Sequence, residues 1–248
     1  MDSPAPVALI TGAAHRLGAH TARHLHNRGW NIVIHYRSRQ EQAEALASEL
    51  NNLREHSAIV LQADLSRPDQ IAPLADQAIA AWGRLDGLVN SASVFYPNPT
   101  EKAQSEDWDT VMSTNLRAPF FLGQACLAAL RSSGGAIVNM IDIYSERPLA
   151  NHPLYCASKA GLASLTQSWA KDLAPEVRVN GVSPGAILWP EGDAEMDQQQ
   201  QQAILDKTPL ATTGKPEDIA GAIAFLLCDA PFITGQILSV DGGRSLNM

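Results

Sequence analysis

Short apolar runs alternate with longer amphipathic stretches along most of the chain. The apolar runs predict β-strands at residues 7–10, 32–34, 58–61, 85–89, 136–141, 177–182 and 236–240. Between these runs, apolar residues recur with helical spacing, and glycines or turn residues end several of the stretches. These stretches predict helices at residues 18–28, 40–54, 66–82, 105–113, 116–131, 153–173 and 217–227. Strands and helices are therefore expected to alternate along the chain.

The predicted strands are continuous apolar runs rather than alternations of apolar and polar residues. Such runs are typical of a parallel sheet that is covered by helices on both faces. Right-handed crossovers between parallel strands then give a doubly wound α/β sheet, a Rossmann fold of about seven strands. No linker interrupts residues 1–248, so a single domain is expected.

The stretch between the sixth predicted strand and the last predicted helix is irregular. Residues 187–207 are rich in Glu, Asp and Gln, and residues 198–202 are all glutamine. This glutamine run suits a solvated helix face as well as disorder. The position of the stretch predicts a lid over the carboxyl ends of the strands, where doubly wound folds bind ligands.

Composition and charge narrow the class of protein. The net charge is −8 and the pI is about 5.3, which argues against a nucleic-acid partner or a membrane-surface role. No apolar run approaches the roughly 18 residues that a transmembrane helix needs. The three cysteines form neither a metal-binding pattern nor a disulfide framework. Together with an N-terminus unlike a signal peptide, these features predict a cytoplasmic protein without a metal site.

Two glycines flank the junction between the first predicted strand and the first helix. Gly12 permits a tight turn, and Gly18 lets the helix pack closely against the sheet. The free N–H groups at the start of that helix, together with its dipole, would then face a pyrophosphate. A strand–helix turn that simply needs glycine explains the same two residues.

The residues after the second predicted strand indicate which nicotinamide cofactor the chain binds. A site for NAD usually places a carboxylate here to bind the ribose hydroxyls, whereas this chain reads Tyr36, Arg37 and Ser38. Arg37 can chelate a 2′-phosphate and Ser38 can add a hydrogen bond, which favours NADPH. Asp64 is placed to bind the adenine edge or to cap a helix, and Asn90 to line the ribose or to form a turn.

Tyr155 and Lys159 lie four residues apart at the start of the predicted helix 153–173. Residues at this spacing share one face of a helix, so the ammonium is expected to lower the pKa of the phenol. A phenol tuned in this way acts as a general acid or base near neutral pH. Taken alone, the pair also fits a surface tyrosine and a surface lysine.

Several motifs occur together in the order typical of the short-chain dehydrogenase/reductase family. They are Thr11-Gly12 with Gly18, Asn90-x-Ala92, Asn115, Tyr155-x-x-x-Lys159, Arg178-Val179-Asn180, Ser183-Pro184-Gly185 and Asp241-Gly242-Gly243. The chain resembles that family over nearly its whole length, which favours catalytic roles for Tyr155 and Lys159. The resemblance implies that Asn115 anchors a water chain leading to Lys159. It also implies cofactor contacts from Leu17, Leu65, Ser91, Ala92, Pro184, Gly185 and Ile187.

Three departures from the common family pattern resemble the pteridine reductase branch. Arg16 stands where most members have glycine, Phe95 follows an altered loop after the fourth strand, and Asp142 replaces a serine. In that branch the arginine reaches both the cofactor phosphate and the ligand, and the phenylalanine stacks on the pterin opposite the nicotinamide. The resemblance implies these roles for Arg16 and Phe95, with Ser93 beside the ligand and Asp142 beside the phenol of Tyr155.

The resemblance implies an NADPH-dependent reductase of dihydropterins. Dihydrofolate and folate are further candidate substrates. Asp142 suits a reaction in which a ring nitrogen is protonated by Tyr155 as hydride arrives at the adjacent carbon. Trp189 is a candidate wall of the substrate site, or a surface or subunit-interface residue. A homotetramer that packs helices 116–131 and 153–173 is expected by analogy.

Other interpretations of the same residues remain open. Phe95 also fits loop packing, Arg16 a contact to phosphate alone, and Asp142 a displaced structural carboxylate. A carbonyl reductase acting on a 3-oxoacyl thioester or a sugar alcohol is the main alternative activity. A protein that senses NADPH without catalysis is the other alternative.

Overall fold

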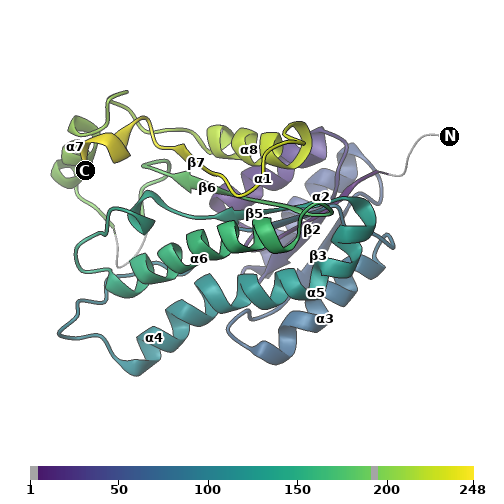
Figure 1. The fold of residues 1–248 in the computed structure, drawn as a ribbon. Helices are drawn as coiled ribbons and strands as arrows, with labels where there is room; N and C mark the ends of the chain where they lie inside the picture. The colour runs from purple at the N-terminus through teal and green to yellow at the C-terminus, as the bar shows by residue number, and fades with distance from the viewer. Residues whose placement is uncertain (1–4, 191–194) are drawn as a thin grey trace.

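The computed structural model describes residues 5–190 and 195–248. In these ranges, seven strands form one sheet in the order β3-β2-β1-β4-β5-β6-β7, and every neighbouring pair is parallel (Figure 1). The strands are β1 Val7–Ile10, β2 Asn31–Tyr36, β3 Ala58–Gln62, β4 Gly87–Asn90, β5 Ala136–Met140, β6 Arg178–Pro184 and β7 Ile237–Val240. This arrangement confirms the predicted doubly wound parallel sheet.

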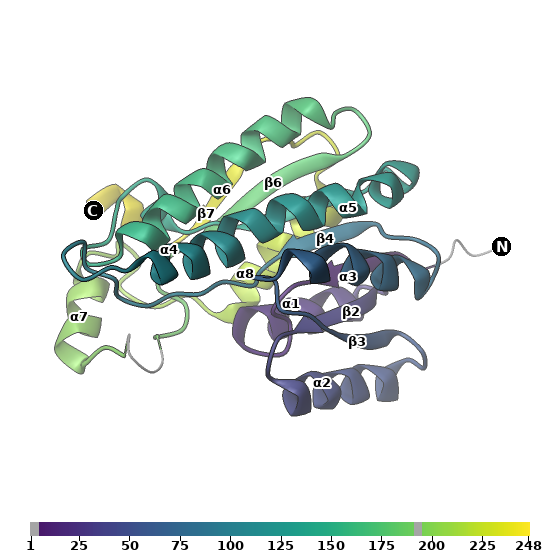
Figure 2. The same cartoon turned by 90° about the horizontal axis from the view of Figure 1, so that it is seen from below.

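The helices of the described residues cover both faces of the sheet. They are α1 Arg16–Asn27, α2 Gln40–Leu53, α3 Pro68–Ala80, α4 Ser105–Met112, α5 Ala118–Ser133, α6 Pro153–Asp172, α7 Gln198–Asp206 and α8 Pro216–Ala224. Helices α1, α2 and α8 pack on one face of the sheet, and α3, α5 and α6 on the other (Figures 1 and 2).

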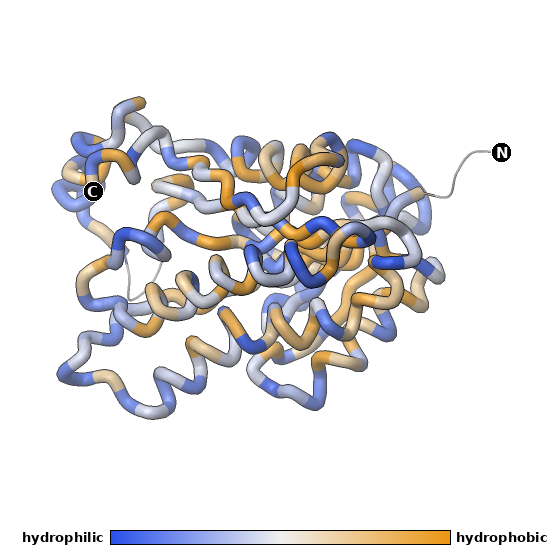
Figure 3. The backbone as a smooth tube through the Cα atoms, in the orientation of Figure 1, coloured by the Kyte–Doolittle hydropathy of each residue, from blue (hydrophilic) through white to orange (hydrophobic). Residues whose placement is uncertain are grey.

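The apolar runs of the sequence become the two halves of the core. In β1, Ala8 and Ile10 join the cluster under α1, α2 and α8, whereas Val7 and Leu9 join the cluster under α3, α5 and α6. Successive side chains of a strand point to opposite faces, so a strand buried on both faces needs apolar residues at every position. Figure 3 shows the hydrophobic segments gathered along the strands, with hydrophilic segments at the rim.

The gap expected between two of the predicted helices is filled by a π-helical turn. The helices expected at residues 105–113 and 116–131 are joined by a π-helical turn, Ser113–Arg117, so that α4 and α5 follow one another without a loop. The apolar periodicity shifts at this point because a π turn changes the register of the two helices. The π turn therefore produces the interruption that the sequence pattern suggested.

The expected lid contains a helix in its described part. Asp197 caps α7 by accepting a hydrogen bond from the backbone N–H of Gln200 at 2.8 Å, and the Gln200 side chain accepts from the Asp197 N–H at 2.9 Å. This reciprocal capping favours the helical alternative for the glutamine run over disorder. Residues 191–194 of the predicted lid lie outside the described residues.

Candidate active site

The residues expected to form the site surround one cavity at the carboxyl edge of the sheet. Its volume is about 570 Å³. The predicted site residues that line it are Gly12, Arg16, Leu17, Gly18, Tyr36, Arg37, Ser38, Asp64, Leu65, Ser91, Ala92, Ser93, Phe95, Asp142, Tyr155, Lys159, Pro184, Gly185, Ile187 and Trp189. Asn90 and Asn115 are the two predicted residues that do not line it.

The glycine turn after β1 is tightly packed. Gly12 has a φ of +66°, and a Cβ there would lie 3.0 Å from the Cα of Ala92. A Cβ on Gly18 would lie 2.5 Å from the carbonyl oxygen of Gly12. The Thr11 hydroxyl accepts hydrogen bonds from the N–H groups of Ser91 and Ala92, each at 3.0 Å. The turn after β1 and the loop after β4 are thus held together as one wall of the cavity.

A buried histidine, not among the predicted site residues, fixes this turn to the sheet. His35 accepts a hydrogen bond from the Gly12 N–H at its Nδ1 (3.1 Å) and donates from its Nε2 to the Ala63 carbonyl (3.1 Å). Both bonds require the neutral imidazole with its proton on Nε2. Burial lowers the pKa of His35 to about 4, although the Ala63 carbonyl and Asp64 oppose the shift.

We expect His35 to make the fold sensitive to acid. Its pKa is lower in the folded protein (about 4) than in the unfolded chain (6.5), so its stabilising contribution is complete above pH 6.5 and is lost as the pH falls toward 4. Between pH 7 and 4.5 the wild type should lose about 2–3 kcal/mol more unfolding free energy than a His35→Gln variant, measured by urea denaturation. His56→Gln, which replaces an exposed histidine, is the control variant. If the unfolding free energy fell equally with pH in the wild type and in His35→Gln, the assignment of the low pKa to His35 would be contradicted.

The expected adenosine end of the cavity carries the residues that follow β2 and β3. Arg37 and Ser38 are exposed and line the cavity. The Asp64 carboxylate accepts from the N–H (2.9 Å) and hydroxyl (2.7 Å) of Ser66. Burial would raise the pKa of Asp64, but the hydrogen bonds of Ser66 and the charge on Arg37 outweigh it, so the pKa is lowered. Asp64 does not cap α3, whose N-cap position is Arg67.

The Asn90 side chain faces the core instead of the cavity, so the prediction that this side chain lines a ribose is wrong, whereas a contact from the Asn90 backbone stays a prediction. Its side-chain amide donates to Asn139 at 2.8 Å, and Asn139 in turn donates to the Thr166 hydroxyl at 2.9 Å. All three side chains are buried. This chain of hydrogen bonds links β4, β5 and α6, so the role of Asn90 in this structure is to join the strands beneath the site.

Arg16 connects the glycine turn to the predicted lid. Its φ is +50°, a left-handed conformation that glycine adopts without strain and that costs other residues about 1–2 kcal/mol. Its guanidinium donates to the carbonyl oxygens of Leu188 (3.0 Å) and Trp189 (2.9 Å). The backbone of the lid segment is therefore bound to the start of α1.

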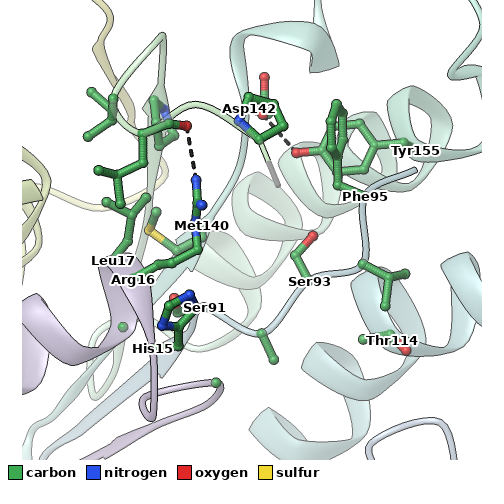
Figure 4. Close-up of a pocket in the computed structure, with 18 of the residues that line it drawn as sticks. His15, Arg16, Leu17, Ser91, Ser93, Phe95, Thr114, Met140, Asp142 and Tyr155 are labelled. Atoms are coloured by element: carbon green, nitrogen blue, oxygen red, sulfur yellow. Dashed lines mark hydrogen bonds between the residues drawn. The ribbon is translucent and has the colours of Figure 1, made fainter. Parts of the chain in front are cut away.

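The phenol of Tyr155 lies against the carboxyl group of Asp142. The Tyr155 hydroxyl donates to Asp142 Oδ2 at 2.7 Å (Figure 4). The N–H of Tyr144 donates to Asp142 Oδ1 at 2.9 Å. Tyr155 and Lys159 share one face of α6, with the ammonium 5.7 Å from the phenol ring centroid. The Lys159 ammonium donates to the Met140 carbonyl at 2.8 Å.

The ionisation of this group differs from the prediction. The pKa of Tyr155 is raised well above its ordinary value, because the phenol is buried and lies beside the charge of Asp142. Burial also raises the pKa of Asp142 and lowers that of Lys159 to about 8. The expected lowering of the phenol pKa by Lys159 is therefore wrong for this structure. A phenol that keeps its proton is a proton donor, as a reduction requires.

Phe95 is held between two aromatic side chains. Its ring stacks on His152, with centroids 4.7 Å apart and an interplanar angle of 11°. It also meets the Tyr155 ring edge to face, with centroids 4.8 Å apart. Figure 4 shows Phe95 beside Tyr155 at the cavity. One aromatic face of the cavity is thus positioned by protein contacts alone.

Asn115 joins the loop after β4 to α6 through its side chain. It lies in the π turn, where its side chain accepts from Val94 N–H (2.9 Å) and the Ser93 hydroxyl (3.2 Å). The same amide donates to the Val94 carbonyl (3.0 Å) and to Ser158 in α6 (3.2 Å). These bonds use the side-chain amide fully and fasten the Ser93 loop to α6. That Asn115 anchors a water chain leading to Lys159 stays a prediction.

Three further residues near the reacting groups were not predicted from the sequence. Tyr144 and Arg244 line the cavity, and His152 supports Phe95. Tyr144 follows Asp142 by two residues, which is the one sequence signal that links it to the site. Arg244 comes from the C-terminal turn Arg244–Asn247, and only the fold brings it near Tyr144.

Two general properties concern the described residues as a whole. No helix among residues 5–190 and 195–248 is both long and apolar enough to cross a membrane. The same residues contain no group of three or more His, Cys, Asp or Glu side chains arranged to hold a metal ion.

Comparison with known proteins identifies the family. A family model described as "Enoyl-(Acyl carrier protein) reductase" matches residues 12–245. Pteridine reductase 1 from Leishmania tarentolae is 35% identical over 283 aligned positions, which cover 98% of this chain and 97% of the relative. A 3-oxoacyl-[acyl-carrier-protein] reductase from Staphylococcus aureus is 34% identical over 239 positions, which cover 95% and 96% of the two chains.

Among solved structures, a blue fluorescent protein from a metagenomic library, in complex with NADPH, has the same fold. Its TM-score is 0.89 at 34% identity, and the match covers 96% of this chain and 97% of that chain. The family match and these relatives extend over nearly the whole chain, and the cavity holds the Tyr155–Lys159 pair of the family motif. The chain therefore belongs to the short-chain dehydrogenase/reductase family.

Proposed function

We propose that this protein is an NADPH-dependent reductase of pterins that converts a dihydropterin to the tetrahydro form. The observation that carries the proposal is the 2.7 Å hydrogen bond from the Tyr155 hydroxyl to Asp142. Reduction of a carbonyl and reduction of a ring C=N bond each add one hydride and one proton. A neutral hydroxyl donor suits the developing alkoxide of a carbonyl, whereas a carboxyl group beside the phenol suits protonation of a ring nitrogen. A carboxyl group beside the phenol can supply or restore that proton.

The cavity offers the groups that NADPH requires. Gly12 and Gly18 give a close-packed turn at the N-terminus of α1, which favours a pyrophosphate, and Arg37 favours a 2′-phosphate over a ribose hydroxyl. NADPH is therefore the cofactor, and it supplies the hydride. Lys159 is placed to hold the nicotinamide ribose, since it lies on the same face of α6 as Tyr155.

The other predicted residues act on the substrate in this proposal. Tyr155 delivers a proton to the ring nitrogen, and Asp142 orients the phenol and returns its proton. Phe95 provides an aromatic surface for a flat heterocycle, with His152 stacked on the ring. Ser93 and Trp189 line the same cavity, and Arg16 holds the lid segment over it. A homotetramer that packs α5 and α6 is part of the proposal.

Reduction of a 3-oxoacyl thioester is the alternative, because a reductase of that name is nearly as similar to this chain as the pteridine reductase is. Asp142 and Phe95 weigh against it. A thioester substrate has no flat ring to place against Phe95. A buried carboxyl group 2.7 Å from the phenol oxygen would also oppose the negative charge that develops on a carbonyl oxygen.

Steady-state kinetics with NADPH tests the proposed function. Dihydrobiopterin, dihydromonapterin, dihydrofolate, folate and an acetoacetyl thioester should be compared side by side, with Tyr155→Phe as the inactive control. We expect turnover of at least one dihydropterin with a kcat/KM well above that of the thioester. Rapid turnover of the thioester with none of the dihydropterins would overturn the proposal. Binding of NADPH without any turnover would favour the non-catalytic alternative.

A further inference from the structure

Arg244 is a buried cation that faces the cavity. It begins the C-terminal turn Arg244–Asn247, is only 8% exposed and lines the same cavity as Asp142. One guanidinium nitrogen donates to the Tyr144 hydroxyl at 3.3 Å, and the guanidinium carbon lies 6.0 Å from the Tyr144 ring centroid. Its Nε is buried without a hydrogen-bond partner among the described residues. Much of its donor capacity is therefore unused.

A structural arginine in the same protein shows the contrast. Arg178 donates to the carbonyl oxygens of Leu226 (2.6 Å), Ala230 (3.0 Å) and Leu227 (2.8 Å). Arg244 makes one long side-chain bond to a neutral hydroxyl instead. A buried arginine charge is costly unless acceptors surround it. Arg244 therefore has fewer hydrogen-bond acceptors around it than a purely structural arginine needs.

The nearby carboxylates do not neutralise Arg244. Asp241, in the same turn, accepts from the backbone N–H groups of Gly243 (2.9 Å) and Ser245 (2.8 Å). Asp142 is close enough for the charge of Arg244 to favour its ionised form, yet its two oxygens are bound to Tyr144 and Tyr155. Among the described residues, no carboxylate oxygen lies within 4.0 Å of the Arg244 guanidinium, the distance that defines an ion pair.

The position of Arg244 places it at the substrate end of the cavity. Arg37 follows β2, the second strand in the sheet order, whereas Arg244 follows β7, the seventh. Five strand spacings amount to about 24 Å, so Arg244 is remote from the expected 2′-phosphate. Tyr144 connects it to the reacting groups, because the Tyr144 backbone binds Asp142 and its hydroxyl binds Arg244.

The turn that carries Arg244 is itself supported by the region before α8. The Leu210 N–H donates to the Gly242 carbonyl at 3.2 Å, and the Asn247 side chain donates to the Lys207 carbonyl at 3.3 Å. Figure 1 shows the C-terminus at the same end of the molecule as α7. The C-terminal turn is therefore a fixed wall of the cavity rather than a loose end.

We propose that Arg244 and Tyr144 form a subsite for an anionic group, a carboxylate in the first instance, on the side chain of the substrate. The chemical class is a flat heterocycle whose ring is reduced beside Tyr155 and whose short substituent bears a negative charge. The identity of the ring rests on the proposed function. A carboxylate at this position accepts charge-assisted hydrogen bonds from the guanidinium and a further bond from the phenol of Tyr144.

Binding of two matched probes to the NADP⁺ complex tests the subsite. The probes are pterin-6-carboxylate and the neutral 6-hydroxymethylpterin, whose affinities are measured by calorimetric titration. We expect the wild type to prefer the carboxylate by roughly tenfold or more, the usual effect of hydrogen bonds to a charged group. Arg244→Gln should abolish the preference and Arg244→Lys should restore part of it, with NADP⁺ affinity unchanged in both. Tyr144→Phe should reduce the preference by less.

The outcomes separate this inference from the proposed function. Equal affinity for the two probes in the wild type, together with turnover of dihydrobiopterin, would overturn the subsite alone. A preference that survives in Arg244→Gln would assign the carboxylate to another residue and would also overturn it. If neither pterin binds and no dihydropterin is reduced, the subsite for an acidic pterin and the proposed function fail together. If Arg244→Gln does not fold, Arg244→Lys and Tyr144→Phe carry the assignment, because each should lower the preference of the wild type.

Discussion

Replacement of Asp142 by serine should lower kcat for a dihydropterin by about 10²- to 10⁴-fold, the range expected when a general acid–base group is lost. Serine can still accept the hydrogen bond that Asp142 receives from the Tyr144 N–H, so the turn Ile143–Ser145 should keep its conformation. The carboxyl group beside the Tyr155 hydroxyl is lost, and with it the group that we propose orients the phenol and returns its proton. Single-turnover kinetics with saturating NADPH measures the effect on the chemical step.

The affinity for NADPH separates this effect from general damage to the site. It should change by less than about twofold in Asp142→Ser, since Asp142 lies on the proposed substrate side and forms none of the expected phosphate contacts. Asp172→Ser, which removes an exposed carboxylate at the end of α6, serves as the matched control and should match the wild type. Undiminished pterin turnover in Asp142→Ser would remove the carboxyl group from the mechanism.

Replacement of Arg37 by aspartate should reverse the choice of cofactor. The variant exchanges a cation that can chelate a 2′-phosphate for a carboxylate that repels it and can bind ribose hydroxyls. We expect kcat/KM for NADPH to fall by about 100-fold or more, equivalent to the loss of hydrogen bonds to a charged group plus a repulsion, while that for NADH changes little or rises. The ratio of the two values of kcat/KM, measured on the same substrate, reports the effect.

A second charge reversal tests whether the effect of Arg37 is local. Arg131 is exposed near the end of α5 and does not line the cavity, so Arg131→Asp changes the net charge equally and should leave the cofactor ratio unaltered. Equal losses with NADPH and NADH in Arg37→Asp would contradict the assignment of Arg37 to the 2′-phosphate. Such a result would leave Arg39, which also lines the cavity, as the next candidate.

The parts of the fold that depend on local sequence were predictable. A strand buried on both faces needs a continuous apolar run, and a helix on its face needs apolar residues at helical spacing, so the alternation of elements followed from the pattern alone. The cavity followed as well, because parallel strands bring the residues after their carboxyl ends to one edge. Arg37, Asp142 and Tyr155 all lie there.

Features that depend on contacts between distant segments could not be predicted in this way. Asn90 is directed into the core by Asn139 and Thr166, and no local pattern contains that information. Arg244 meets Tyr144, a residue 100 positions earlier in the chain, only because β7 closes the sheet. The raised pKa of Tyr155 reflects how deeply the fold buries the phenol and how close the phenol lies to Asp142.

The π turn Ser113–Arg117 makes the length of the chain between α4 and α5 a functional property. Removing one residue from this turn would let the two helices merge into one regular α-helix, which is the usual relation between a π turn and its parent helix. The flanking helices would keep their faces, because a π turn absorbs one extra residue, and the backbone of the turn itself would take a new path. Asn115 would be carried away from the Ser93 loop and from Ser158, the two segments that it joins. A one-residue deletion would therefore leave the helix intact and still release the Ser93 loop of the cavity from α6. Most point substitutions on the outer face of α5 would not have this effect.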